Sequence, residues 1–272
     1  MGSIPFIGGD DVEAQLNWQD ACRAIRAGHN LERAQIKDTF IERENNTLLS
    51  RSAWVPGLGI GTKTATIFGN NASIGLPSVS SVFTLFDDKT GVPRAMVDGN
   101  LVTRWKTAAD SMLGAQILAR EDASTLLIVG AGAVAASLIE GYCQLFPRLT
   151  EISVWNRTES RANYLVSQYE KLAVNVHVVQ NLESAAAAAD IISCATLSSE
   201  PIIHGDWVKP GTHVDLIGAY KPDMREADDA LLQNADLYVD CRDTTLDHIG
   251  ELLIPIKNGI ISRTEILGDL YD

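Results

Sequence analysis

The stretch TLLIVGAGAVAASLIEGY, residues 125–142, contains an apolar run, a glycine turn and then apolar residues at helical spacing. A predicted strand that leads through such a turn into a helix is typical of a dinucleotide-binding βαβ unit. The first glycine allows the tight turn, the second lets a pyrophosphate approach the backbone, and Ala135 takes the place of the third glycine. We therefore favour nucleotide binding, with the phosphates at the helix N-terminus, over a turn that serves packing alone. The expected cofactor contacts in this turn are Gly130, Ala131, Gly132, Ala133 and Val134.

The end of the second predicted strand bears on the choice of cofactor. NAD-specific folds usually have an aspartate or glutamate there, which accepts hydrogen bonds from the ribose hydroxyls. This chain has SVWNRTES instead, with Asn156, Arg157 and Thr158 as the expected cofactor contacts. No carboxylate repels a 2′-phosphate, and the Arg157 guanidinium can bind one. We therefore expect NADPH, with NADH as the second choice; the alternative is that Arg157 is a solvated surface arginine.

Strands alternate with helices from residue 121 to the end of the chain. This alternation predicts an α/β fold with a doubly wound parallel sheet, a Rossmann domain over 121–272. The predicted strands are 125–129, 151–155, 175–179, 190–195, 213–217 and 236–240, and the predicted helices lie at about 133–146 and 158–171, with a short one in NLESAAAAAD.

The first part of the chain has a different character. Apolar residues recur at helical spacing over 12–25, which predicts one or two helices. Short β-like runs separated by Gly, Pro, Asn and Asp fill 47–97, with a hairpin turn expected at DDKTG, 87–91. A long helix is predicted at 103–120. These patterns predict a separate α/β domain over 1–120, built on a twisted and mostly antiparallel sheet.

The composition excludes several classes of protein. The net charge is −13, and such an acidic surface repels the phosphates of nucleic acid. The four cysteines and five histidines lack metal-site spacing, and the cysteines are expected to be core residues in a reducing compartment. No apolar run reaches membrane-spanning length, and the N-terminus lacks the pattern of a signal peptide. We therefore expect a cytoplasmic protein with no metal, no nucleic-acid partner and no membrane association.

Cations stand at defined positions in the first part of this acidic chain. Arg51 and Lys63 lie in β-like runs among apolar neighbours, and Arg104 and Lys106 lie at the start of the long predicted helix. A single charged residue on a strand usually faces solvent. Two of them on adjacent runs, with Lys106 on a nearby helix, indicate a pocket that binds a carboxylate.

Several segments together resemble one family. They are SRSAW, GTKTAT, GLPSVSS, VDGNLVTRWKTAADS, IVGAGAVA, VWNRT and IGAYKPDMRE. In this order they resemble the ornithine cyclodeaminase/mu-crystallin family over nearly the whole chain, and VDGNLVTRWKTAADS is the most specific piece. The resemblance implies a Rossmann domain beside an N-terminal α/β domain for substrate binding and dimerisation, and hence a homodimer. It also implies a cyclodeaminase, an alanine dehydrogenase, or a reductase of ketimines or Δ1-pyrroline-2-carboxylate.

The resemblance assigns roles to residues that match the family's motifs. Lys63 matches a lysine that touches the substrate carboxylate and the reacting centre, and Arg51 matches an arginine that binds the carboxylate. Lys106 stands where most members have arginine, and Lys37 loosely replaces an upstream substrate arginine. The remaining expected cofactor contacts are Ser78, Thr107, Thr196 and Gly218.

The segment LIGAYKPDMRE separates the possible reactions. The cyclodeaminases carry an aspartate in the place of Tyr220, and a tyrosine cannot act as a carboxylate base. We therefore favour hydride transfer from NAD(P)H to the C=N carbon of a small α-imino acid, with Lys63 and Tyr220 as catalytic residues. Arg51 and Lys106 would hold the substrate carboxylate. These cations would lower the pKa of Lys63, so that it relays a proton or orients water.

Several alternatives stay open from the sequence. Tyr220 closes the pocket, binds a water or packs in the core, and Asp223 and Glu226 are expected to begin a helix. The substrate is a cyclic imine such as Δ1-pyrroline-2-carboxylate or a dicarboxylic imine such as iminosuccinate, and alanine dehydrogenase chemistry also fits. The other candidates are an ornithine cyclodeaminase and a non-catalytic NADPH-binding protein. Family members continue past EILGDLYD with a segment that returns to the first domain and supplies a serine near the cofactor, and we expect this chain to lack it.

Overall fold

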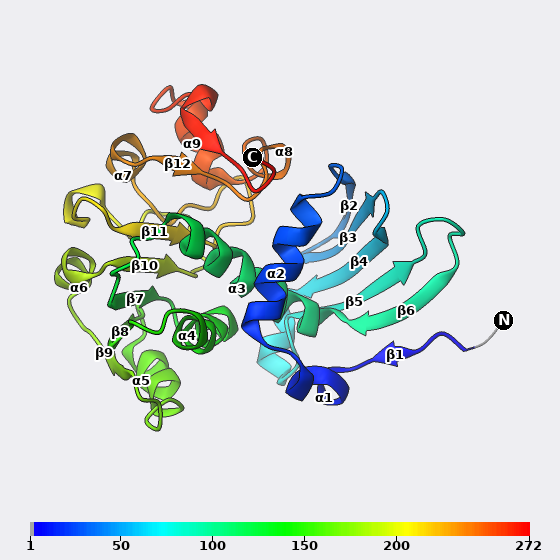
Figure 1. Cartoon of the computed structure of the whole chain (residues 1–272), viewed down its shortest axis with the longest axis horizontal. Coiled ribbons are helices and arrows are strands. Elements are labelled where there is room, and N and C mark those ends of the chain that lie inside the picture. The colour runs from blue at the N-terminus through cyan, green and yellow to red at the C-terminus, as the bar shows by residue number, and fades with distance from the viewer. Residues whose placement is uncertain (1–2) are drawn as a thin grey trace. The chain divides into compact units, whose positions relative to one another are not determined.

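The computed structural model describes residues 3–272, and the chain divides into two compact units, Met1–Lys106 and Thr107–Asp272 (Figure 1). The division falls inside the long helix α3, Gly99–Leu118, whose N-terminal part belongs to the first unit. Each unit contains its own main sheet.

A six-stranded sheet forms the first unit. Its strand order is β1-β6-β5-β4-β3-β2, and neighbouring strands are antiparallel except for β1 and β6, which are parallel. The prediction of a mostly antiparallel sheet is confirmed. The hairpin turn at 87–91 is also confirmed, because Asp87 there accepts the backbone N–H groups of Lys89 and Thr90. The strands are β1 (Phe6–Ile7), β2 (Gln35–Arg43), β3 (Asn46–Val55), β4 (Gly59–Phe68), β5 (Val79–Phe86) and β6 (Pro93–Asp98).

Strand β2 lies outside the runs that the sequence patterns predicted as strands. It pairs with β3 along its whole length, across a tight turn in which Glu44 has a φ of 55°. Nearly all of its residues are exposed, because β2 is the edge strand of the sheet. An edge strand with no buried face leaves little alternation of polar and apolar residues, and this is why the sequence did not reveal it.

The helices of the first unit pack through aromatic side chains. Trp18 of α2 is buried, and its ring lies 4.1 Å from the ring of Trp105 in α3. Helix α3 begins directly after β6 at Gly99, where a Cβ would lie 2.6 Å from the backbone of Ser81 in β5. This close approach sets the first turn of α3 against the sheet. The short elements before α3 are α1 (Gly9–Val12), η1 (Glu13–Gln15), α2 (Trp18–His29) and η2 (Gly69–Ile74).

A five-stranded parallel sheet forms the centre of the second unit, and its order is β11-β10-β7-β8-β9. The chain runs outward from β7 to β9 and then returns through α6 to β10, beside β7. Such a reversal of strand order leaves a crevice at the carboxyl ends of the two central strands. The predicted Rossmann fold is thus confirmed. The strands are β7 (Thr125–Val129), β8 (Glu151–Trp155), β9 (Asn175–Val178), β10 (Ile191–Cys194) and β11 (His213–Leu216).

The central strands of this sheet are buried, which explains why the sequence predicted them well. All of β10 and all of β7 after Thr125 are buried among apolar side chains. Parallel strands covered on both faces give continuous apolar runs of this kind. The helices of this unit are α4 (Ala133–Leu145), α5 (Glu159–Ser167), α6 (Leu182–Ala188), α7 (Asp229–Asn234), α8 (Arg242–Thr245) and α9 (Gly250–Lys257), with η3 (Gly205–Trp207) and η4 (Arg263–Glu265).

The predicted strand at 236–240 does not join the parallel sheet. Strand β12, Leu237–Tyr238, pairs instead with β13, Ile266–Gly268, in a separate two-stranded sheet. The apolar side chains around it form their own cluster, which includes Leu246 and Leu252. A short apolar run indicates a strand but does not indicate its partner, because pairing depends on residues far along the chain.

Asp190 ties the start of β7 to the start of β10. Its carboxylate accepts the backbone N–H groups of Ser124 and Thr125, and it pairs with Arg120 and Lys209 at 3.0 Å each. Burial alone would raise the pKa of Asp190, but the hydrogen bonds from Ser124, Lys209 and Thr125 hold that pKa well below its usual range. This single side chain fixes the segment that leads into the glycine turn.

Candidate active site

The glycine turn lies at the carboxyl end of β7, as the sequence predicted. Gly130 has a φ of +118°, and a Cβ there would lie 2.6 Å from the carbonyl oxygen of Ala195, so the position requires glycine. Nothing lies within 4 Å of the place where a Cβ of Gly132 would stand. Gly132 has no side chain to cap α4, so the first N–H groups of this helix are available to an anion. Ala135 is fully buried, as expected for the position that packs helix against strand.

Asn156, Arg157 and Thr158 follow β8 at the same edge of the sheet. The side-chain amide of Asn156 donates to the Thr158 carbonyl at 2.8 Å, which leaves the Asn156 side-chain oxygen as an acceptor. Arg157 is exposed, whereas the nearby Glu159 carboxylate accepts a hydrogen bond from Gln180. The residues after β8 thus offer a ligand an amide oxygen and a guanidinium.

Glu226 belongs to the same edge of the sheet, contrary to the expectation that it begins a helix. Its side chain is fully buried, and the helix that follows begins later, at Asp229, with Asp228 as its cap. Glu226 Oε1 accepts from the backbone N–H and the hydroxyl of Thr196 at 2.6 and 2.7 Å. Its Oε2 accepts from the N–H of Gly218 at 2.6 Å. Because Thr196 and Gly218 follow β10 and β11, one carboxylate holds the ends of both strands.

A second buried carboxylate lies behind the first. Glu251 of α9 accepts from the backbone N–H of Glu226 at 2.6 Å and from that of Ala227 at 3.0 Å. Burial raises the pKa of Glu251 to about 7, although these hydrogen bonds oppose the rise. Burial also raises the pKa of Glu226, and its hydrogen bonds from Thr196 act in the opposite direction. Two successive carboxylates therefore fix the loop that follows β11.

Arg51 of β3 and Lys63 of β4 lie directly opposite each other in the first unit. Directly opposite residues of antiparallel strands share one face of the sheet, so these two cations lie side by side. Lys63 donates to the Thr103 hydroxyl in α3, which itself donates to the Gly99 carbonyl at 2.7 Å. The pKa of Lys63 is lowered first by burial, then by the charges of Lys106 and Arg51. The lowered pKa was expected, but burial rather than the neighbouring cations is its largest cause.

Asp38 joins the same row of residues. It stands opposite Arg51, whose Nε and Nη2 donate to its two carboxylate oxygens at 2.8 and 2.6 Å. This bidentate pair fixes the plane of the guanidinium. Because successive side chains of a strand alternate between faces, Lys37 lies on the opposite face from Asp38. Lys37, which the resemblance places loosely at a substrate arginine, therefore lies on the other face from Arg51 and Lys63.

Three further predicted residues lie in or near α3 and β5. Lys106 is exposed and ends the first unit, and Thr107 begins the second. Ser78 is half-buried just before β5. Arg104, a cation singled out in the sequence, forms an ion pair with Glu13. Arg104 therefore serves contacts within the first unit.

Tyr220 lies in the loop after β11. Its side chain is 53% exposed, so it does not pack in the core of the second unit. The ammonium of Lys221 lies 5.4 Å from the centre of its ring. Of the roles that the sequence left open for Tyr220, closing the pocket and binding a water remain.

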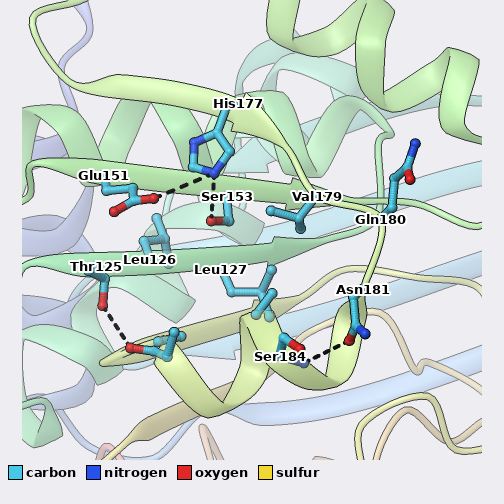
Figure 2. Close-up of a pocket in the computed structure, with 13 residues that line it drawn as sticks. Thr125, Leu126, Leu127, Glu151, Ser153, His177, Val179, Gln180, Asn181 and Ser184 are labelled. Carbon is cyan, nitrogen blue, oxygen red and sulfur yellow. Dashed lines mark hydrogen bonds and ion pairs between the residues drawn. The ribbon is translucent and has the colours of Figure 1, made fainter.

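A cavity of about 360 Å³ opens on the face of the second unit's sheet beside α6 (Figure 2). His177 Nε2 lies 3.5 Å from the Glu151 carboxylate and 3.4 Å from Ser153 Oγ. In a catalytic triad the carboxylate binds the other ring nitrogen from the nucleophile, whereas both partners here meet one nitrogen. None of the residues predicted to bind cofactor or substrate is among those lining this cavity. The glycine turn is therefore the better candidate for the cofactor site.

Four residues of these sites were not found from the sequence, or were given another role. The position of Asp38 beside Arg51 depends on the register of β2, and the sequence patterns did not predict β2 as a strand. Thr103 is part of the recognised VDGNLVTRWKTAADS segment, but its contact with Lys63 depends on how α3 meets the sheet. Glu226 and Glu251 lie 25 residues apart with no periodic relation, so no local signal joins them.

Two searches of residues 3–272 bear on other classes of protein. No group of three or more His, Cys, Asp and Glu side chains among them could hold a metal ion. The longest helices of this part of the chain are too short or too polar to cross a membrane.

Together, the parallel sheet, the glycine turn and the polar strand ends define a dinucleotide-binding α/β protein. The model of the ornithine cyclodeaminase/mu-crystallin family matches residues 53–272, and the chain belongs to this family. It is 51% identical over 267 residues to Delta(1)-pyrroline-2-carboxylate reductase of Paracoccus denitrificans (strain Pd 1222). That match covers 98% of this chain and 84% of the relative.

Two solved structures share the fold. One is Delta(1)-pyrroline-2-carboxylate reductase of Thermococcus litoralis in complex with NADH and L-proline, with a TM-score of 0.90 and 26% identity over 98% of this chain and 85% of that one. The other is the iminosuccinate reductase of Paracoccus denitrificans in complex with NAD+, with a TM-score of 0.89 and 25% identity over 98% and 84% of the two chains. These findings confirm the predicted family and fold, and the protein is a nicotinamide-dependent oxidoreductase.

Proposed function

We propose that the protein reduces the C=N bond of a cyclic α-imino acid of the Δ1-pyrroline-2-carboxylate class with hydride from NADPH. The observation that carries this proposal is Lys63, a half-buried ammonium of lowered pKa directly opposite Arg51. The 51% identity to a reductase of that name supports the choice of substrate class. We assign Lys63 and Tyr220 to the catalytic site, and Arg51, Lys63 and Lys106 to the substrate carboxylate.

The reaction converts C=N into CH–NH, and so needs a hydride at carbon and a proton at nitrogen. A bound reduced nicotinamide supplies the hydride. We assign the proton at nitrogen to Lys63, because a lowered pKa makes its ammonium a better acid at neutral pH. The Thr103 hydroxyl gives its own proton to Gly99 and therefore accepts from Lys63, which orients the ammonium. Tyr220, exposed after β11, is assigned to closing the pocket.

The charge around Arg51 favours a substrate with one carboxylate. Asp38 occupies two donors of the Arg51 guanidinium and offsets its charge. A dicarboxylic imine such as iminosuccinate would bring a second negative charge close to Asp38, which is unfavourable. We therefore favour a cyclic monocarboxylate over iminosuccinate.

The preference for NADPH rests on Arg157. A guanidinium at the end of the second strand can bind a 2′-phosphate, and Glu159 is engaged by Gln180. We expect Arg157→Ala to raise the KM for NADPH about tenfold and to change the KM for NADH by less than about twofold. Steady-state kinetics with both cofactors test this, with Arg161→Ala as the matched control on α5. Equal losses with NADPH and NADH would remove Arg157 from cofactor selection.

We also propose that the protein is a homodimer through its first unit. Exposed apolar side chains lie on one face of the neighbouring strands β2 and β3, at Ile41, Leu48 and Trp54. Clusters of exposed apolar residues of this kind are typical of protein interfaces. Sedimentation should give a dimer for the wild type and a monomer for Ile41→Glu. Tyr164→Glu, at an exposed site on α5, should remain a dimer, and a wild-type monomer at micromolar concentration contradicts this proposal.

The central test is the oxidation of NADPH and NADH with a panel of imines. The panel holds Δ1-pyrroline-2-carboxylate, iminosuccinate formed from oxaloacetate and ammonia, and pyruvate with ammonia. We expect the cyclic imine to be the best substrate and Lys63→Ala to lower its kcat/KM by about 100-fold. Lys89→Ala, at an exposed lysine of the 87–91 turn, is the control and should keep the wild-type rate.

The same assay separates the other candidate functions. An unchanged rate in Lys63→Ala would remove this lysine from the mechanism. Sustained formation of proline from L-ornithine would make the protein a cyclodeaminase. NADPH that binds but is not consumed with any imine would indicate a binding protein without activity.

A further inference from the structure

We infer that Glu226 is a positioning residue for the nicotinamide end of the cofactor, because it commits the Thr196 hydroxyl to accept a hydrogen bond from the ligand. The group recognised in this way is an N–H donor, the carboxamide of the nicotinamide. This inference rests on the proposed function, since it requires that a nicotinamide dinucleotide binds at the glycine turn.

The carboxylate of Glu226 is surrounded by donors. The Thr196 N–H and hydroxyl approach one oxygen, the Gly218 N–H approaches the other, and the Cys194 thiol also hydrogen-bonds to the group. An ionised carboxylate has about four acceptor sites and no proton to give. All four donors are therefore satisfied by one buried side chain.

This arrangement fixes the role of the Thr196 hydroxyl. A hydroxyl has a single proton, and that of Thr196 is given to Glu226 at 2.7 Å. Its lone pairs remain, apart from a long contact with the Ser198 N–H at 3.4 Å. Towards a ligand, the side chain of Thr196 can then only accept. The backbone around it is also fixed, because a Cβ on Gly218 would lie 2.0 Å from the Thr196 carbonyl oxygen.

The topology indicates which part of the dinucleotide meets Thr196. The phosphates bind at the glycine turn after β7, and the adenosine ribose binds at the residues after β8. The other half of the molecule then extends to the opposite side of β7, where β10 ends. A Cβ on Gly130 would lie 3.6 Å from the methyl group of Thr196, so the two strand ends are close neighbours. On that half of the cofactor, the carboxamide N–H₂ donates without accepting, whereas the ribose hydroxyls do both.

Glu251 provides a matched control within the same structure. It is also a buried glutamate that accepts two backbone N–H groups, but it binds Glu226 and Ala227 rather than the strand ends. The substitutions Glu226→Leu and Glu251→Leu remove all side-chain acceptors at two successive layers, whereas a glutamine would keep one acceptor oxygen. Both should lower the thermal midpoint of unfolding, but the first alone frees the Thr196 hydroxyl to donate to the cofactor.

The test compares the binding of NADH with that of its 3-acetylpyridine analogue, in which a methyl ketone replaces the carboxamide and removes the N–H donors. Dissociation constants are measured by titration calorimetry on each purified variant. Their ratio does not depend on the fraction of active protein. The wild type should bind the analogue about tenfold more weakly than NADH, and Glu251→Leu should keep this ratio. Glu226→Leu should reduce it to about twofold or less.

Each result of these titrations supports or overturns the role inferred for Glu226. A wild-type ratio near one, an unchanged ratio in Glu226→Leu, or an equal loss in Glu251→Leu overturns the inference. If Glu226→Leu does not fold, Thr196→Val must lose the discrimination and Thr196→Ser must keep it. A Val variant that still discriminates overturns the inference. A wild type that binds neither dinucleotide contradicts the proposed function itself, so the two failures are distinguishable.

Discussion

At the scale of single residues, Lys63 acquires its chemistry from its surroundings. Burial beneath α3 lowers its pKa, two cations lower it further, and Thr103 fixes its direction. The sequence predicted that Arg51 and Lys63 share a pocket, because they lie on adjacent β-like runs, and the strand register places them directly opposite each other. It did not predict Asp38, whose place depends on the register of an edge strand.

The pH dependence of the reaction tests this view of Lys63. If its ammonium form is required, kcat/KM falls as the pH rises through its pKa, and the lowered pKa places this fall at lower pH than for an ordinary lysine. Lys106→Gln removes one of the charges that lower the pKa, so the fall should move to higher pH. The pH profile of kcat/KM for the imine measures this, with Lys89→Gln as the control. If Lys106→Gln does not shift the pH profile of kcat/KM, the role assigned to Lys63 is contradicted.

At the scale of elements, the side chain of Asp190 links the starts of the two central strands of the second unit, which also pair through their backbones. It receives backbone N–H groups from the start of β7 and pairs with Arg120 and Lys209. Asp190→Ala should lower the free energy of unfolding by about 3 kcal/mol, since it leaves these donors without their acceptor. Asp122→Ala removes an exposed partner of Arg120 and should change the free energy of unfolding by less than about 0.5 kcal/mol. Urea denaturation measures the free energy of unfolding of both variants. Equal losses would show that Asp190 does not stabilise the link between the two strands.

Glu251 makes the stability of the α9 contact depend on pH. Its folded pKa of about 7 lies above the ordinary value of 4.5, so the folded state binds more protons between these values. Its contribution to stability is therefore fully present below about pH 4.5 and is lost as the pH rises through 7. Glu251→Gln removes this dependence.

The difference in free energy of unfolding between wild type and Glu251→Gln should then shrink by about 3 kcal/mol from pH 5 to pH 8. Denaturant titrations at each pH measure it. Taking the difference between two variants cancels the opposite trend from His213, whose burial lowers its pKa to about 4. A constant difference across this range contradicts the raised pKa of Glu251.

The elements differ in how far the sequence predicts them. Strands β7 and β10 are buried on both faces, and their continuous apolar runs identify them. Strand β2 is exposed and β12 pairs outside the main sheet, so neither is determined by local pattern. The buried carboxylates Glu226 and Glu251 could not be predicted, because their partners come from distant parts of the chain.

At the scale of the whole molecule, the alternation of strands and helices predicted the Rossmann unit, and the motifs predicted the family. The chain, with a net charge of −13, places Arg51 and Lys63 side by side in its first sheet and has a glycine turn at the end of β7 in its second unit. In the proposed reaction, these cations would bind the imino acid and the turn would bind the cofactor.

The most direct test of this account follows the hydride itself. NADPH carrying deuterium on one or the other face of C4 is incubated with Δ1-pyrroline-2-carboxylate, and the proline formed is examined by mass spectrometry and NMR. One of the two labelled forms should place a single deuterium at the α-carbon of proline, at a rate that Lys63→Ala lowers about 100-fold. Proline without deuterium from either form, or no proline at all, would contradict the proposed reduction.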